Sequence, residues 1–195
     1  MIYKIRQFAT FFSAFAIIFL TFSNCTQSVQ NTETKRNICI EKVDSLAYML
    51  QSTRNLFVFK MDEFIERQEE MNDNLTKVKF IPANKLTEEN MSDVSQYNAI
   101  FNVYKSNSGK YKEVVLEAEN LFYEIKGIEQ ELKKGKFDKE IDEFLNEYNH
   151  LKIELKHNHK ETIEVTEELK SVEPTYMRIA PAVDQIMESN FPTKQ

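Results

Sequence analysis

Two pairs of glutamate and histidine have the spacing that a helix needs to present both side chains on one face. Glu147 precedes His150 by three residues, and Glu154 precedes His157 by three residues. Side chains three residues apart on a helix lie about one turn apart on the same face. Because carboxylate and imidazole groups bind transition metals, the pairs give one hypothesis, a metal-binding helical bundle or a metal-dependent enzyme.

The same pairs have a simpler interpretation. In helical bundles that bind two metal ions, Glu-x-x-His pairs come from two different helices and project inward. Here both pairs fall on one predicted helix, and Tyr148 and Leu155 occupy its apolar face, which leaves His150 and His157 on the flank. His159 is a third imidazole nearby, but it faces another direction than His157 does. The alternative is therefore a set of solvated surface histidines without a metal or other cofactor.

No other group of reactive residues has the spacing of a catalytic motif. The chain has no nucleophile motif, no glycine-rich phosphate loop, no Cys-x-x-Cys pair and no zinc-protease signature, so we expect that it is not an enzyme. Polar residues do interrupt the apolar positions of the predicted helices. They could form a buried polar site between helices, or a polar layer that fixes the register of the helices. These residues are Arg54, Gln68, Ser108, Asn158 and Thr162.

The elements that position these residues are predicted from apolar residues at steps of three and four, which indicate long helices with heptad patterns. Pro82, Gly135 and Pro174 should end helices, and Pro181 should kink or restart the last one. The apolar pattern passes through Ser106–Gly109 without losing phase, so we expect one continuous helix there. The predicted helices cover about 37–78, 87–135, 138–172 and 176–190.

This pattern predicts an all-α fold, an elongated antiparallel bundle of three long heptad-patterned helices plus a short C-terminal helix. The architecture resembles a spectrin-like three-helix bundle, and that resemblance carries no function. Four tyrosines at seam positions, Tyr97, Tyr104, Tyr111 and Tyr148, are expected in the core with their hydroxyls at its rim. The run Leu56–Phe59 is expected to pack under residues 174–195, or alternatively to form an exposed patch for a partner protein.

The first 25 residues have the layout of a secretory leader. Lys4 and Arg6 precede an apolar run from Phe8 to Phe22, which is too short and too interrupted for a comfortable membrane span. The segment Phe22-Ser23-Asn24-Cys25 follows. It resembles the signal peptide of a bacterial lipoprotein, whose cleavage site ends in a cysteine that becomes lipidated, although Phe22 and Asn24 depart from the strict pattern.

The resemblance implies a lipid anchor at Cys25, with Thr26 in place of aspartate favouring the outer membrane over the inner one. An ordinary cleaved leader with a free Cys25, or an uncleaved anchor, are the alternatives. The expected organisation is a signal peptide over 1–24, the lipidated cysteine and a flexible tether over 25–36, a helical bundle over 37–190 and a tail over 191–195.

Composition limits the classes of partner. The net charge is -6, and removal of the leader with Lys4 and Arg6 gives -6 - 2 = -8 for the body. An acidic body repels phosphate backbones, so we expect no nucleic-acid partner. Cys39 would then have no partner within the chain if Cys25 is lipidated. The function expected is that of a lipid-anchored, non-enzymatic binding or scaffolding protein of a bacterial envelope, with an envelope protein as partner.

Overall fold

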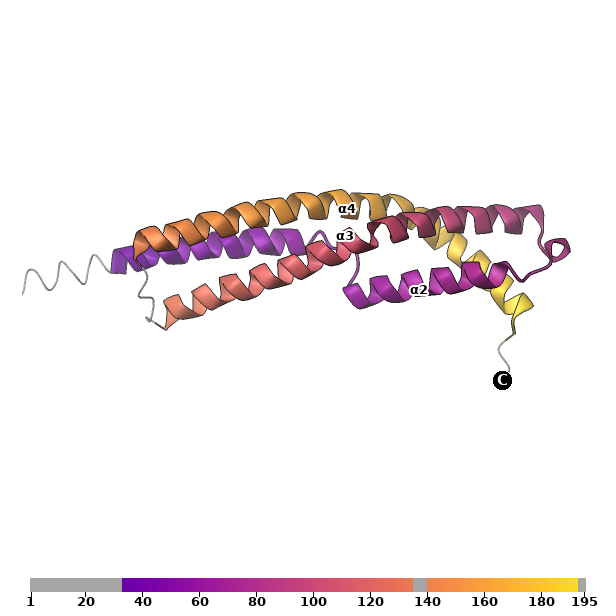
Figure 1. Ribbon diagram of the computed structural model, residues 1–195, viewed down its shortest axis with the longest axis horizontal. Coiled ribbons are helices and arrows are strands. Elements are labelled where there is room, and N and C mark those ends of the chain that lie inside the picture. The colour runs from indigo at the N-terminus through magenta and orange to yellow at the C-terminus, as the bar shows by residue number, and fades with distance from the viewer. Residues whose placement is uncertain (1–32, 135–139, 193–195) are drawn as a thin grey trace, which may run out of the picture. The chain divides into compact units, whose positions relative to one another are not determined.

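The computed structural model describes residues 33–134 and 140–192, and these residues form an all-α bundle, as predicted (Figure 1). Cys25, the leader and Gly135 lie outside the described residues. The helices cover residues 33–54, α2 (Met61–Val78), α3 (Glu88–Lys133) and α4 (Ile141–Asn190), with a 3-10 turn, η1 (Ala83–Lys85), between α2 and α3.

The chain divides into two compact units. The described residues of the first unit are 33–45, 126–134 and 140–149, and those of the second are 46–125 and 150–192. In the first unit, residues 33–36 are helical, so the predicted flexible tether over 25–36 is wrong at its last four residues. The Arg36 guanidinium donates to the carbonyl of Leu132 at 3.0 Å. This contact satisfies one of the carbonyls that the end of α3 leaves without a helical partner.

Contacts within the second unit establish the direction of its helices. Polar contacts between α3 and α4 join residues whose numbers rise on one helix as they fall on the other, so the two helices are antiparallel there. The pairs along α3 are Gln96–Arg178, Asn107–Glu168 and Val114–Asn158. Thr53 contacts His159 and Arg67 contacts Glu173, both across 106 positions, so residues 46–54 and α2 run parallel to α4.

The predicted single helix over 37–78 is wrong, because residues 55–60 interrupt it. The Tyr111 hydroxyl of α3 donates to the carbonyl of Phe59 at 2.6 Å and accepts from its N–H at 3.0 Å. This side chain therefore satisfies the two backbone groups that a helix would have paired. The next residue, Lys60, donates its N–H to the Glu63 carboxylate at 3.3 Å, which begins α2 with one half of a capping box.

The interruption does not shift the register of the chain against α4. Thr53 lies before it and Arg67 after it, and both contact residues 106 positions later. Between Thr53 and Arg67 the chain has 14 positions, as many as α4 has between His159 and Glu173, although residues 55–60 are not helical. For this reason the predicted apolar pattern still identifies Phe64 and Met71 of α2 as core residues beyond the break.

α3 is one continuous helix through Ser106–Gly109, as predicted. Its start is capped, since Thr87 Oγ1 accepts from the N–H of Asn90 at 3.1 Å and the Asn90 side chain accepts from the N–H of Thr87 at 3.1 Å. The buried residues of α3 alternate strictly between steps of three and four. They are Tyr97, Ile100, Tyr104, Asn107, Tyr111, Val114, Ala118, Leu121, Ile125, Ile128 and Leu132.

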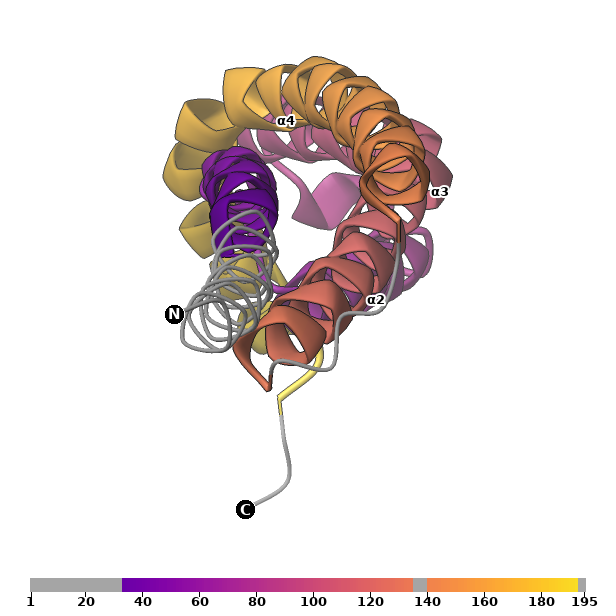
Figure 2. The ribbon, with the colours of Figure 1, turned by 90° about the vertical axis from the view of Figure 1, so that its left-hand side faces the viewer.

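α4 continues through both of its prolines, so the predicted stop at Pro174 and separate helix over 176–190 are wrong. A proline deprives the carbonyl four residues earlier of its partner, which costs about 3 kcal/mol in a helix interior. Pro174 and Pro181 are both exposed, and so are Lys170 and Met177, the residues four positions before them. Within the second unit, the stretch of α4 that carries both prolines is curved (Figures 1 and 2), and proline is a recognised cause of helix bending.

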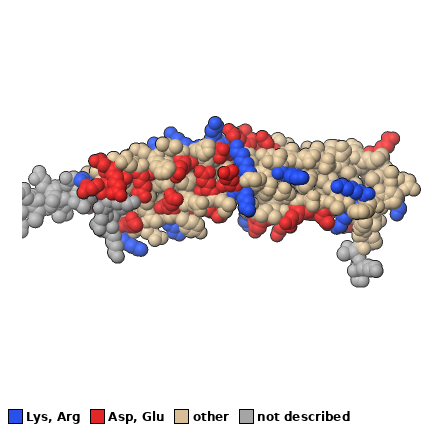
Figure 3. Space-filling view, viewed as in Figure 1, with Lys and Arg blue, Asp and Glu red and all other residues tan. Residues whose placement is uncertain are grey.

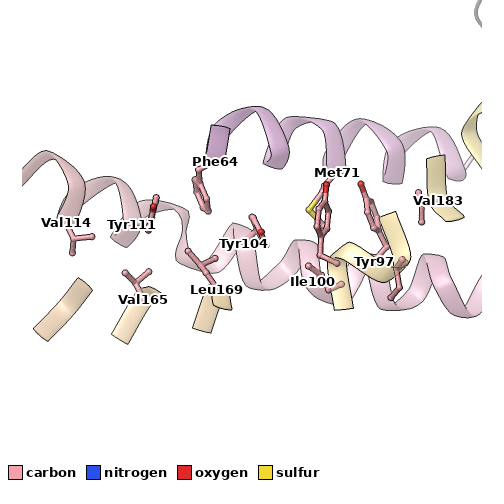
Figure 4. Packing of buried hydrophobic residues seen from close by; sticks show 12 residues of the cluster. Phe64, Met71, Tyr97, Ile100, Tyr104, Tyr111, Val114, Val165, Leu169 and Val183 are labelled. Carbon is pink, nitrogen blue, oxygen red and sulfur yellow. The ribbon is translucent and has the colours of Figure 1, made fainter. Parts of the chain in front are cut away.

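The helix persists because its heptad pattern continues beyond Pro174. The apolar face that includes Leu169 is extended by Tyr176, Ile179 and Val183, all buried. In the second unit these residues join side chains of α2 and α3 in one cluster, part of which Figure 4 shows converging from the three helices. Burial of these three side chains contributes about 1.5–3 kcal/mol each, a sum of the same order as the cost of the two prolines.

Replacement of Tyr111 by phenylalanine should destabilise the protein by about 1–3 kcal/mol. The variant keeps the buried ring but leaves the N–H and carbonyl of Phe59 without their partner. Urea unfolding would measure the loss. The matched control is Tyr123→Phe on the same helix, because Tyr123 is 70% exposed and should change stability by less than about 0.5 kcal/mol. Equal stability of the two variants would contradict the role of the Tyr111 hydroxyl.

Candidate functional site

The predicted metal ligands all lie on α4, but the contacts of the histidines differ from the expected ones. His150 and His157 are exposed, and Nε2 of each lies 3.5 Å from a glutamate four residues later, Glu154 and Glu161 respectively. Glu147 and Glu154 are partly buried. Among the described residues, no three histidine, cysteine, aspartate or glutamate side chains are placed to hold a metal ion. The geometry therefore gives the metal hypothesis no support.

His159 is the histidine that contacts another helix, which its sequence position did not predict. Its Nδ1 lies 3.0 Å from Thr53 Oγ1, and Thr53 is fully buried. The contact joins α4 to the end of the first helix, directly before the interruption. The spacing of Thr53 from Cys39, Val43, Leu46 and Leu50 follows the heptad, which is the signal that marks it as an inward position.

Three of the five predicted polar seam residues, Gln68, Ser108 and Asn158, form hydrogen bonds between helices. Ser108 donates to the Gln68 side-chain carbonyl at 3.0 Å, so these two residues meet. Asn158 is fully buried, and its amide donates to the carbonyl of Val114 at 2.9 Å. Such bonds favour one alignment of α2, α3 and α4. Arg54 is exposed, and its guanidinium contacts α3 by lying over the Phe122 ring, 5.2 Å from the centroid.

Two atoms of this polar layer have no partner. Asn158 Oδ1 and Thr162 Oγ1 are buried and accept or donate no hydrogen bond within the described part of the chain. They belong to residues four apart on α4, and therefore to one face of it. An unsatisfied buried polar atom costs about 1–3 kcal/mol, so this layer specifies the alignment of the helices at the expense of stability.

The interruption at 55–60 creates a cleft. The non-helical backbone leaves a hollow of about 780 Å³ between residues 54–63 and α3. Six apolar residues line it, and five charged residues complete its lining. The apolar residues are Phe57, Val58, Phe59, Met61, Val115 and Ala118, and the charged ones are Arg54, Lys60, Asp62, Glu63 and Glu119. We call this hollow the aromatic cleft.

The aromatic run Leu56–Phe59 is held in place by packing on one side. All four residues are partly buried. The Phe57 ring meets the Tyr111 ring edge to face at 6.1 Å, and the Phe59 ring lies 5.9 Å from that of Tyr104. Both phenylalanines pack against the core cluster that includes Tyr176 of α4. The run is thus intermediate between the two predicted states, a covered segment and an exposed patch.

An ion pair anchors α2 beside the cleft. Arg67 donates to Glu173 at 2.6 Å and to the Tyr104 hydroxyl at 3.0 Å, and that hydroxyl donates to Glu173 at 2.8 Å. The Arg67 guanidinium also lies 4.5 Å from the ring centroids of both Phe59 and Tyr176. Cation–π contacts of this kind are stronger when water is excluded. One arginine therefore joins the aromatic run, α3 and α4.

The hydroxyls of Tyr97, Tyr104 and Tyr111 were predicted to lie at the rim of the core, and the structure places these tyrosines inside it. All three are buried, and their hydroxyls bond to groups inside the protein. Tyr148, the fourth seam tyrosine, is buried in the first unit. Burial raises the pKa of the hydroxyls of Tyr97, Tyr104, Tyr111 and Tyr176 above its usual value. These groups are packing elements, not proton donors poised for neutral pH.

No family model, curated protein or solved structure matches this chain. None of the described helices combines the length and the apolar character needed to cross a membrane. On the face visible in Figure 3, acidic side chains are most numerous toward the left-hand side, and basic side chains gather near the middle.

Replacement of Glu173 by glutamine should destabilise the protein by about 1.5–3 kcal/mol. The Arg67 guanidinium would lose its counter-ion, and both side chains are only about a quarter exposed in the wild type. Chemical denaturation at neutral pH would measure the effect. Glu167→Gln is the matched control, because Glu167 is an exposed carboxylate of α4. A loss below about 0.5 kcal/mol for Glu173→Gln would show that the pair is not an anchor.

Stability should fall as the pH rises above about 10. Tyrosines of the unfolded chain ionise near pKa 10, whereas burial keeps the four core hydroxyls neutral to higher pH. Their contribution is therefore complete below about pH 10 and is lost progressively above it. Unfolding free energies between about pH 8 and pH 11 would test this dependence. The Tyr97→Phe variant should lose less stability over this range than the wild type, and Tyr123→Phe should behave like the wild type.

Proposed function

We propose that this chain is a lipid-anchored, non-enzymatic binding or scaffolding protein of a bacterial envelope, placed at the outer membrane in preference to the inner one. The observation that carries the proposal is the segment Met1–Cys25, in which two basic residues, an apolar run and a terminal cysteine follow in the order of a lipoprotein leader. Acyl chains on Cys25 would hold the helical body at the membrane, since each buried methylene contributes about 0.8 kcal/mol.

The helical body supports a binding role. Its tyrosine hydroxyls and its buried polar residues serve packing and alignment, and its exposed histidines pair with glutamates on the same helix. These arrangements support recognition by a surface in preference to chemistry on a substrate. The partner proposed is a protein of the same envelope, and the acidic charge of the body disfavours nucleic acid.

Metabolic labelling with palmitate tests the anchor directly. The full chain, expressed in a bacterium that acylates lipoproteins, should incorporate palmitate, and Cys25→Ala should abolish the label. Cys39→Ala is the matched control, because the Cys39 thiol is buried in the first helix and burial raises its pKa, so the variant should remain labelled. The lipid anchor would be refuted if the wild type and Cys25→Ala were labelled equally, or if neither protein were labelled.

A further inference from the structure

The aromatic cleft has the size and the lining of a site for a small amphipathic molecule. Its volume of about 780 Å³ lies within the range of about 300–1,000 Å³ that is usual for small-molecule sites. Phe57, Val58, Phe59 and Met61 line it from the interruption and the start of α2, and Val115 and Ala118 line it from α3. This apolar lining suits one acyl chain, because burial of methylene groups there would release water from both surfaces.

The charged residues of the lining are not all neutralised by one another. Lys60 pairs with Glu63 at 3.4 Å, and the Asp62 side chain accepts from the N–H of Glu63 at 3.0 Å. Arg54 and Glu119 remain. Within the described ranges, neither lies at ion-pair distance from an opposite charge. The cleft therefore offers one cation, Arg54, and two carboxylates, Glu119 and Asp62, that form no ion pair among the described residues, and of these two carboxylates Asp62 already accepts a backbone hydrogen bond.

We propose that the aromatic cleft binds a single-chain phospholipid whose head group carries both a phosphate and an ammonium group. The acyl chain would lie on the apolar lining, the phosphate would bind the Arg54 guanidinium, and the ammonium would bind the Glu119 carboxylate. Arginine recognises phosphate through two parallel hydrogen bonds. The inference specifies a ligand for the binding role proposed above, but it does not require acylation of Cys25.

The charges favour a zwitterionic head over an anionic one. A purely anionic amphiphile would satisfy Arg54 but would meet the carboxylate of Glu119 in the same lining, together with those of Asp62 and Glu63. Like charges at close range disfavour binding, whereas an ammonium group turns the same carboxylate into a partner. An uncharged alkyl chain would gain the apolar contact alone.

Photolabelling of the full chain tests the proposal. The probe is a short-chain lysophosphatidylethanolamine with a photoreactive group at the end of its acyl chain, used below its micelle concentration. Mass spectrometry of the digested protein should place the label within residues 54–63 or 115–119. Unlabelled lysophosphatidylethanolamine should compete. A lysophosphatidate and a neutral alkyl glycoside of equal chain length should compete more weakly, by about fivefold to tenfold.

Variants separate the head-group contacts from the apolar lining. Arg54→Gln and Glu119→Gln should each weaken binding of the zwitterionic probe by about fivefold to tenfold. Both side chains are exposed, so helix content and thermal midpoint should not change. Arg178→Gln is the matched control, since Arg178 is an exposed arginine of α4 that contacts Gln96 and does not line the cleft. Its binding should equal that of the wild type.

Several results would overturn the proposal. These are label confined to residues outside the cleft, equal competition by the neutral glycoside, stronger competition by the lysophosphatidate, or unchanged binding by both Arg54→Gln and Glu119→Gln. The full chain with Cys25→Ala separates this proposal from the lipid anchor. If the wild type incorporates no palmitate while the cleft of the Cys25→Ala variant is photolabelled, the anchor is wrong and the ligand stands. The opposite pattern would reject the ligand and leave the anchor intact.

Discussion

The hydroxyl of Tyr111 is the contact on which the second unit depends. It satisfies both backbone groups of Phe59, and so it allows the chain to leave the helical conformation in the middle of an apolar segment. A buried backbone N–H or carbonyl without a hydrogen-bond partner would lower the free energy of unfolding by about 1–3 kcal/mol. The aromatic cleft exists because the helix is interrupted there.

Arg67 extends this arrangement from the backbone to the helices. Its guanidinium lies between two aromatic rings, Phe59 and Tyr176, and bonds to Glu173 and Tyr104 at its edge. An arginine in such a place uses both its flat faces and its fork of donors, which lysine does not provide. The interruption, α2, α3 and α4 are thereby fixed to one another within the second unit by a single side chain. That rigidity would keep the lining of the aromatic cleft in place.

The sequence predicted the fold class and most of the heptad positions, because burial in long helices follows a simple period. Tyr97, Tyr104, Tyr111, Leu155 and Leu169 were all identified as core residues in this way. The period could not reveal the interruption, since residues 55–60 preserve the register against α4. It also could not reveal that prolines are tolerated in α4. That tolerance depends on which face the prolines occupy and on the tyrosine and aliphatic residues that follow Pro174.

The candidate site was less predictable than the fold. Leu56–Phe59 stood out as apolar on nearly every side, but only the position of Tyr111 shows why the run forms one wall of a cleft. Arg54 was identified as a polar residue in an apolar register, and that anomaly is now explained by its exposed position at the cleft. Glu119 and Arg67 gave no signal in the sequence, because charged residues on a helix surface are common and their partners are distant in the chain.

The constant offset of 106 positions between the first two helices and α4 has a consequence for changes in chain length. A residue inserted in α2 would rotate every later side chain of that helix by about 100 degrees and move Met71 out of the core. A residue inserted between Asn55 and Lys60 would be absorbed by irregular backbone, with both flanking helices left in phase. Length variation in this protein should therefore concentrate in the wall of the cleft, where it would alter the shape of the binding surface without remodelling the bundle.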